Sequence, residues 1–216
     1  MNEGQKMTAK PIIWIFGALL IVAVGVIVYL LMRNDATTDD DAGQNINTAA
    51  AENSNAPGNA NSREESAYIG EGFTVTQPAG WTQGKIMGTI ASFVKTGETF
   101  PQDSAAGKIN FQSYIAVSFD NTNGKTLTDV YDLSIDTISK IVSSLNVFAT
   151  SDETVNGLPA KFSAMEFTQQ DVEYTVLVAI MMAGDKYYSM SFNTTTDRWL
   201  EYKDMFYDVA RSFRLK

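Results

Sequence analysis

Ser92 and Lys95 lie close together in the stretch SFVKTG, where they match two short hydrolase patterns. S-x-x-K supplies a nucleophilic serine with a nearby lysine, and K-T-G belongs to the same penicillin-recognising enzymes. In those enzymes the two patterns are separate elements with separate lysines, whereas here Lys95 belongs to both. The companion S-D-N is missing from the chain. We therefore interpret the match as chance and keep a membrane-tethered Ser/Lys hydrolase as the least favoured function.

The segment DNTNG, residues 120–124, resembles the start of a calcium-binding loop. An EF-hand needs oxygen ligands at positions 1, 3 and 5, glycine at position 6 and glutamate at position 12. In this chain the glycine comes one position early and Tyr131 occupies position 12. The segment therefore predicts a polar turn and no metal site.

Asp171 and Glu173 flank Val172 at the start of a predicted strand, so we expect their side chains to point the same way. Paired carboxylates can act as acid and base when burial separates their pKa values. At a strand edge, however, they more often keep the edge soluble. We expect this second role, and name the pair together with Trp81 as weak candidates for contact with a partner.

The composition removes several classes of chemistry. The chain has no cysteine, which excludes disulfides, thiol catalysis, thiolate metal sites and a lipid-modified N-terminal cysteine. It also has no histidine, the commonest general base and metal ligand. A net charge of −9 argues against nucleic acid as a partner. We therefore expect no catalytic residue and no cofactor.

An uncharged apolar segment of 22 residues runs from Pro11 to Met32. As a helix it would be roughly 33 Å long, which matches a hydrocarbon core of about 30 Å. Trp14 and Tyr29 lie toward its opposite ends, where interfacial aromatic residues are favoured. The run is too long for the apolar part of a signal peptide, and no cleavage site follows it directly. We expect a single-pass, uncleaved signal-anchor in the lipid bilayer.

The flanks of this segment predict its orientation. Lys6 and Lys10 precede it, whereas Arg33 alone follows before a run of aspartates begins. Cytoplasmic flanks carry the excess of lysine and arginine. We therefore expect residues 1–10 in the cytoplasm and the C-terminal part outside the cell membrane.

Residues 33–66 contain almost no large aliphatic side chain. Such a stretch cannot bury enough apolar surface to offset its ordering entropy, so the sequence predicts a disordered tether. Treated as a coil, the tether would span roughly 30 Å. We expect residues 67–216 to form one globular domain.

Within this domain, alternating and apolar runs predict strands, and three- and four-residue spacing predicts helices. Asn156-Gly157 between two runs is a strong hairpin signal, and Trp81 is expected to fold back over the sheet as a plug. The result is an α+β fold whose mainly antiparallel sheet has about six or seven strands with packed helices. The strands are expected at 73–78, 86–94, 111–119, 148–155, 158–167, 172–182 and 187–195, and the helices at 126–145 and 196–213.

Four stretches in this region, GFTVTQPAGW, VNGLPA, YTVLVAIMMAGDKYYSMSFNTT and WLEYKDMFYDVARSF, resemble those of PsbP-like domains. The resemblance implies the Mog1/PsbP α/β/α sandwich. Named members include an extrinsic photosystem II subunit and a Ran-binding nuclear import factor, and most act in binding or assembly without catalysis. Photosystem subunits of this type are linked to retention of calcium, chloride and manganese. No ligand motif of the family matches this chain, so no functional residue is transferred.

These observations together predict a membrane-anchored extracytoplasmic module that recruits a protein partner and catalyses no reaction. A tether favours this role because it raises the local concentration near membrane partners. A small-ligand or ion-binding domain is the alternative, and it would need a concave pocket with converging polar groups.

Overall fold

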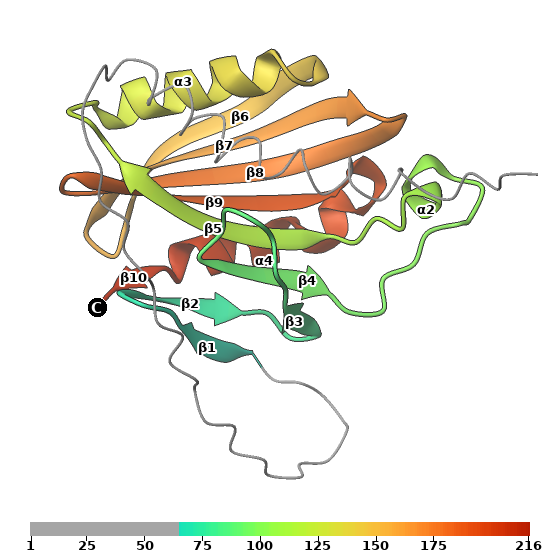
Figure 1. Cartoon of the computed structure of the whole chain (residues 1–216), viewed down its shortest axis with the longest axis horizontal. Coiled ribbons are helices and arrows are strands. Elements are labelled where there is room, and N and C mark those ends of the chain that lie inside the picture. Colours follow the sequence, from blue (N-terminus) through green and yellow to red (C-terminus); the bar gives the residue numbers. More distant parts are fainter. Residues whose placement is uncertain (1–64) are drawn as a thin grey trace, which may run out of the picture.

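The computed structural model describes residues 65–216, which form two antiparallel sheets and several helices (Figure 1). The predicted cytoplasmic tail, the anchor with Pro11, Trp14, Tyr29 and Met32, and the tether up to residue 64 lie outside the described residues. Within residues 65–216 no helix combines the length and apolar character needed to cross a bilayer. The elements are β1 (Ser66–Ile69), β2 (Phe73–Gln77), β3 (Trp81–Gln83), β4 (Ala91–Lys95), α2 (Ala105–Lys108), β5 (Tyr114–Asn121), α3 (Leu127–Ser139), β6 (Ser143–Val155), β7 (Leu158–Gln169), β8 (Val172–Ala183), β9 (Lys186–Thr195), η2 (Thr196–Arg198), α4 (Trp199–Arg211) and β10 (Arg214–Leu215).

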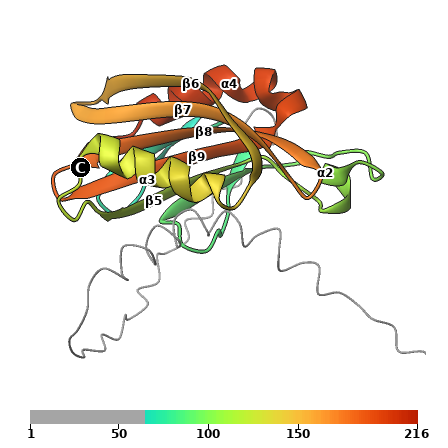
Figure 2. The same cartoon turned by 90° about the horizontal axis from the view of Figure 1, so that it is seen from above.

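The larger sheet has seven strands in the order β3-β4-β5-β9-β8-β7-β6, and every neighbouring pair is antiparallel. Figure 2 shows α3 and α4 on opposite faces of this sheet, so the domain has three layers. This confirms the predicted, mainly antiparallel sheet with packed helices. The second sheet, β1-β2-β10, was not predicted.

Alternation along β8 divides its apolar residues between two cores. Leu177, Ala179 and Met181 belong to the core on the α4 side. Val176, Val178 and Ile180 belong to the core on the α3 side. A strand buried on both faces reads as a continuous apolar run, which explains the uninterrupted apolar segment from Val176 to Met182. Met181 and Met190 are fully buried in the core.

The helix predicted over 126–145 begins where expected but ends at Ser139. Thr126 accepts the backbone N–H of Asp129, and the Asp129 carboxylate accepts the N–H of Thr126, which completes a capping box. Leu145 lies on β6 instead, and still packs against the core on the α3 side. The C-terminal part of the apolar stripe that the spacing predicted as helical therefore belongs to strand β6.

Three other predicted boundaries shift. The strand predicted over 86–94 starts only at Ala91, because the N–H of Thr89 bonds the carbonyl of Ile86 and closes a turn. The strand predicted over 111–119 occupies Tyr114–Asn121. The final helix is preceded by the 3-10 turn Thr196–Arg198, and no side chain caps it.

The C-terminus is fixed to the smaller sheet. β10 pairs with β2, which also pairs with β1. The backbone N–H of Lys216 donates to the carbonyl of Gly72, and its Nζ donates to the carbonyl of Gly70. Both ends of residues 65–216 therefore lie in the smaller sheet, with Ser66 opposite Gln77 at one end of β2 and Leu215 opposite Phe73 at the other (Figure 1).

Candidate functional site

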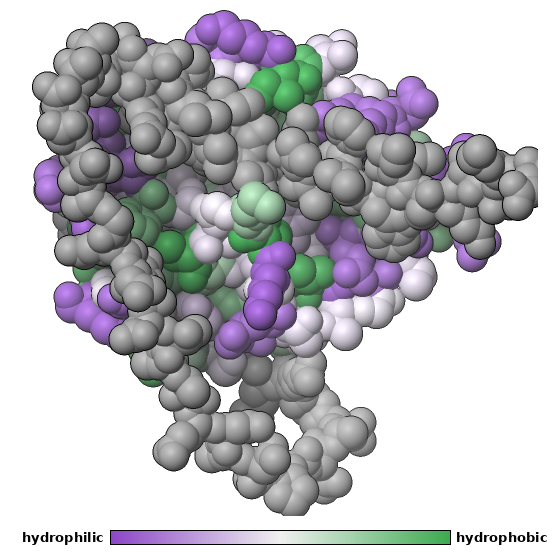
Figure 3. Space-filling view, in the orientation of Figure 1, coloured by the Kyte–Doolittle hydropathy of each residue, from purple (hydrophilic) through white to green (hydrophobic). Residues whose placement is uncertain are grey.

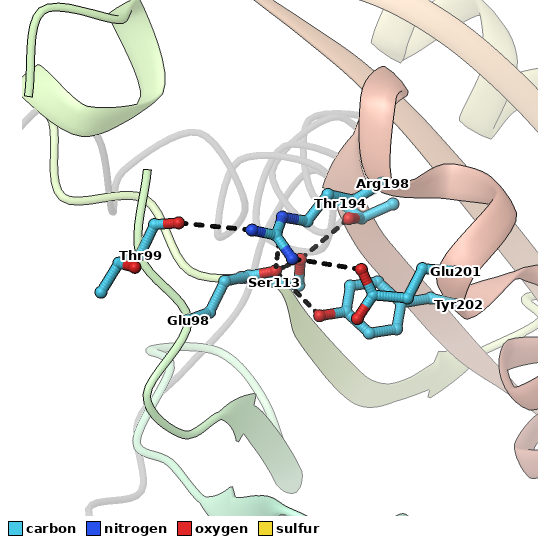
Figure 4. A network of polar contacts seen from close by, with 7 residues as sticks. All are labelled: Glu98, Thr99, Ser113, Thr194, Arg198, Glu201 and Tyr202. Atoms are coloured by element: carbon cyan, nitrogen blue, oxygen red, sulfur yellow. Dashed lines mark hydrogen bonds and ion pairs between the residues drawn. The ribbon is translucent and has the colours of Figure 1, made fainter. Parts of the chain in front are cut away.

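A buried carboxylate, that of Glu98, is the centre of a polar network between the β4–β5 loop and α4 (Figure 4). Only 8% of Glu98 is exposed to solvent. Ser113 donates both its backbone N–H and its hydroxyl to this carboxylate, the latter at 3.0 Å. Tyr202 donates its hydroxyl at 3.0 Å. The carboxylate thereby joins the loop that holds Glu98 and Ser113 to α4, which is far away in the sequence.

The network continues on both sides of the carboxylate. Because the Ser113 hydroxyl donates to Glu98, the hydroxyl of Thr194 must be the donor in their 2.8 Å hydrogen bond. Arg198 places its Nε 3.7 Å from Glu98 Oε1, bonds Glu201 at 3.1 Å, and stacks over the Phe100 ring. The cation thus compensates a carboxylate that has been removed from water.

The network also shifts the pKa values of two groups. Burial, followed by the charge of Glu98, raises the pKa of Tyr202 well above 10.0. Burial alone would lower the pKa of Arg198, but the charge of Glu98 and its neighbours outweighs burial and raises it. Tyr202 stays neutral and Arg198 stays charged, which are the states that the hydrogen bonds require.

This arrangement is suited to holding a loop, and poorly suited to proton transfer. Both oxygens of Glu98 already accept hydrogen bonds from protein donors. A general base must reach the proton of a substrate, and a carboxylate enclosed in this way has no side open to one. We conclude that Glu98 positions the 96–113 loop, which carries α2, against α4.

The serine and lysine of the S-x-x-K match do not form a catalytic pair. Residues three apart on a strand point to opposite faces, so Ser92 and Lys95 diverge on β4. The Ser92 hydroxyl is buried and has no hydrogen-bond partner in the described part of the chain. No base is therefore in place to activate it.

The structure also separates the three residues named as candidate partner contacts. Trp81 lies on β3, is 2% exposed, and packs edge-on against Tyr202 and Phe206 of α4. Asp171 lies in the β7–β8 turn, with a positive φ of 61°, and Glu173 lies near the start of β8. Both acids are exposed, whereas Trp81 is buried in the core. The three do not form one surface.

Clusters of acidic residues and surface depressions are the other features that could hold a ligand. In residues 65–216 no three acidic side chains are grouped so that they could hold a metal ion. Two shallow depressions, one lined by Ile86 and Ser92 and the other by Thr76 and Ser212, have volumes of about 190 and 220 Å³. Ligand pockets commonly measure about 300–1,000 Å³. On the face in Figure 3, hydrophobic residues lie in small groups between hydrophilic ones.

A surface that the sequence reasoning missed lies along β6 and the start of α4. Phe148 is 45% exposed and meets Trp199 edge-on, with ring centroids 6.2 Å apart. Leu200 follows the buried Trp199 in the sequence and is 86% exposed. We call Phe148, Trp199 and Leu200 the apolar edge patch. Val147 is also exposed, but it lies opposite Met165, which belongs to the core on the α3 side, so it faces the other side of the sheet. The sequence signal of the patch is faint, because a single phenylalanine marks it on β6.

Comparison with known proteins places the fold. A model of the PsbP family matches residues 66–215. The solution structure of cyanobacterial PsbP (CyanoP) from Synechocystis sp. PCC 6803 is 19% identical with a TM-score of 0.52, and the match covers 70% of this chain and 92% of that one. LpqN, a protein involved in cell envelope biogenesis of Mycobacterium tuberculosis, is 13% identical with a TM-score of 0.53, over 70% and 90% of the two chains. No curated protein matches the sequence of this chain.

Proposed function

The chain belongs to the PsbP family, and we propose that it is a membrane-anchored extracytoplasmic module that recruits a protein partner at the membrane surface without catalysing a reaction. The predicted anchor at residues 11–32 and the predicted tether at residues 33–66 would hold the domain near the membrane while leaving it free to turn.

The observation that carries this proposal is the state of Glu98. It is the carboxylate best shielded from water among those that the network joins, and its oxygens already accept bonds from Ser113 and Tyr202. A domain whose buried polar groups serve its own packing must act through its surface. A tethered surface is effective because the tether raises the local concentration of the domain near membrane partners.

The ligand-binding alternative has less support. The two depressions are smaller than a usual ligand pocket, and neither gathers several charged groups. The hydrolase alternative has less still, since Ser92 and Lys95 diverge on β4. The cell-envelope role stated for LpqN fits the same compartment, although that likeness is one of fold.

The experiment that tests the proposal is crosslinking of the full-length chain in cells, followed by mass spectrometry. The control is a chain of residues 1–66, which keeps the anchor and tether and lacks the domain. We expect a specific protein to be captured only when residues 67–216 are present. Equal capture by both chains would refute recruitment by the domain.

A further inference from the structure

The edge strand β6 ends the seven-stranded sheet, and one side of its backbone has no neighbouring strand in residues 65–216. It is 13 residues long, and nearly all of its side chains are exposed or half-buried. The opposite edge, β3, has three residues. Short edges expose few unpaired backbone groups, whereas a long one offers a row of donors and acceptors to an incoming strand.

Part of β6 is shaped for regular pairing. Irregularities between Ser143 and Asn146 and between Val147 and Ala149 twist its first half. From Ala149 to Val155 the register with β7 is unbroken. In an antiparallel ladder every second residue turns both backbone groups outward, so about three or four residues of this stretch present free groups. Residues 143–155 contain no lysine, arginine or proline, which commonly protect edges.

The apolar edge patch lies beside this stretch. Phe148 immediately precedes it and contacts Trp199, while Leu200 is 86% exposed. An exposed aromatic residue next to free backbone groups is what an added strand needs, because hydrogen bonds supply affinity and side-chain contacts supply specificity. Phe148 connects the two features, since it precedes the regular stretch and contacts Trp199.

We propose that the outer edge of β6 binds an extended segment of the protein partner, which adds to the sheet as an eighth strand and places an apolar side chain against Phe148 and Leu200. This inference rests on the proposed function and names the surface and the form of the partner.

The acidic residues of β6 argue for a different protein and against a second copy of this chain. Asp152 is the central residue of the regular stretch, its side chain is 74% exposed, and it forms an ion pair with Lys161 of β7 at 2.6 Å. A twofold antiparallel pairing about that centre would bring the Asp152 residues of two copies opposite each other, and like charges there are destabilising. In such a pairing of two copies, each Lys161 would still leave the two exposed carboxylates facing each other. A partner segment with a lysine or arginine opposite Asp152 would be stabilised instead.

The position of β6 favours the same role. Strand β3 lies at the other end of the seven-strand order, six intervals away, which corresponds to roughly 29 Å. In Figure 1 the strands β1 and β2, where the chain enters the domain, lie on the β3 side of the sheet. The β6 edge therefore faces away from the point of attachment.

The test uses the full-length chain in cells, with a photoreactive amino acid in place of Phe148 or, as a matched control, of Phe119. Phe119 lies on β5 and is 46% exposed, close to the 45% of Phe148. We expect a partner segment to be captured from position 148 and not from position 119. That segment, made as a peptide, should slow amide exchange in residues 149–155 of the full-length protein.

Variants distinguish strand addition at the β6 edge from nonspecific hydrophobic binding. Phe148→Ala should weaken peptide binding about tenfold or more, while Phe119→Ala leaves it unchanged. The backbone N–H groups of Thr150 and Ser151 point to opposite sides of β6, because successive residues of a strand alternate. Proline at one of the two positions therefore removes a hydrogen bond to β7, and proline at the other blocks only the outer edge. The variant that keeps the folded spectrum should not bind. If both unfold, Phe148→Ala decides the matter.

Several results would overturn the inference. They are capture from position 148 of a second copy alone, binding that survives Phe148→Ala, and exchange in residues 149–155 that the peptide does not slow. Capture from an exposed loop position such as Gln102, with none from 148, would overturn the β6 inference and leave the proposed recruitment standing. If no position in residues 67–216 captures a protein, both fail.

Discussion

The hydroxyl of Tyr202 donates a 3.0 Å hydrogen bond to the carboxylate of Glu98, which lies 104 residues earlier in the chain. This bond joins the 96–113 loop to α4 (Figure 4), and both of its residues are buried. The network around this bond is important for stability, because a carboxylate buried away from water must keep its hydrogen-bond donors and its counter-charge.

Replacing Glu98 with alanine should therefore be severe. The change leaves the Tyr202 hydroxyl and the Ser113 N–H without their acceptor, which costs about 2–6 kcal/mol at about 1–3 kcal/mol for each buried donor. Urea unfolding of a fragment of residues 65–216 measures it. Glu201→Ala is the matched control: its side chain is 52% exposed and bonds Arg198 of the same network, so the loss should stay within about 1 kcal/mol. Equal losses would contradict the assigned role of the network.

Trp81 should behave as a core residue. Its ring fills the space between β3 and α4, so Trp81→Ala should cost about 3–5 kcal/mol in the free energy of unfolding. Trp81→Phe keeps an aromatic ring there and should lose markedly less. Denaturant midpoints of the two variants measure the difference. A Trp81→Ala domain as stable as the parent would mean that the ring does not support the fold.

Stability should fall at alkaline pH. Burial raises the pKa of Tyr174 to about 12, and that of Tyr114 well above 10.0. A group with a raised folded pKa stabilises the fold fully below its ordinary value and loses this contribution as pH rises through the folded value. The free energy of unfolding should therefore decline from about pH 10 upward. Tyr174→Phe should make the decline shallower, and tyrosinate absorbance should follow unfolding.

A smaller effect is expected at acid pH. The hydrogen bonds from Arg211 lower the pKa of Glu153 below its ordinary 4.5. A lowered carboxyl pKa stabilises the fold above the ordinary value and loses that contribution as pH falls below it. Glu153→Gln should flatten the acid limb of a stability–pH curve, and Arg211→Gln should flatten it equally. A change with only one variant would show that the two residues act separately.

The membrane topology can be checked with single cysteines, because the chain has none of its own. Gln102 is exposed on the 96–113 loop, and Asn2 lies in the predicted cytoplasmic tail. In intact cells, a membrane-impermeant maleimide should label Gln102→Cys and spare Asn2→Cys until the cells are opened. The reverse pattern would place the domain in the cytoplasm.

The sheet could be predicted from sequence because its signals are local. Asn156-Gly157 sits in the turn between β6 and β7, and Asn156 has the positive φ of 48° that such a turn requires. The helix boundary near Ser139 was wrong because Val142 and Leu145 contact the same core from a non-helical segment and a strand. The spacing of apolar residues shows which side of a segment is buried, and it does not show whether that segment is a helix or a strand.

The Glu98 network could not be predicted from sequence, for a different reason. Its hydrogen bonds connect residues 15, 81 and 104 positions apart, and each residue type alone is common on protein surfaces. No spacing rule links a loop glutamate to a helix tyrosine. The strand at 148–155 was predicted, but its start at Ser143 and its place at the edge of the sheet were not, since a polar, exposed segment resembles a loop in composition.

The four-residue strand β1 has a mechanical consequence. It pairs only with β2, and Ser66, where the chain enters, sits at the open end of that hairpin opposite Gln77. If the chain before Ser66 held the domain while β6 held a load, the pull would run across the strands, and the residue pairs would separate in succession. β1 would then yield first, lengthening the attachment by up to roughly 13 Å while the seven-stranded sheet stayed whole. Unpairing of β1 would thus limit the force that reaches the larger sheet.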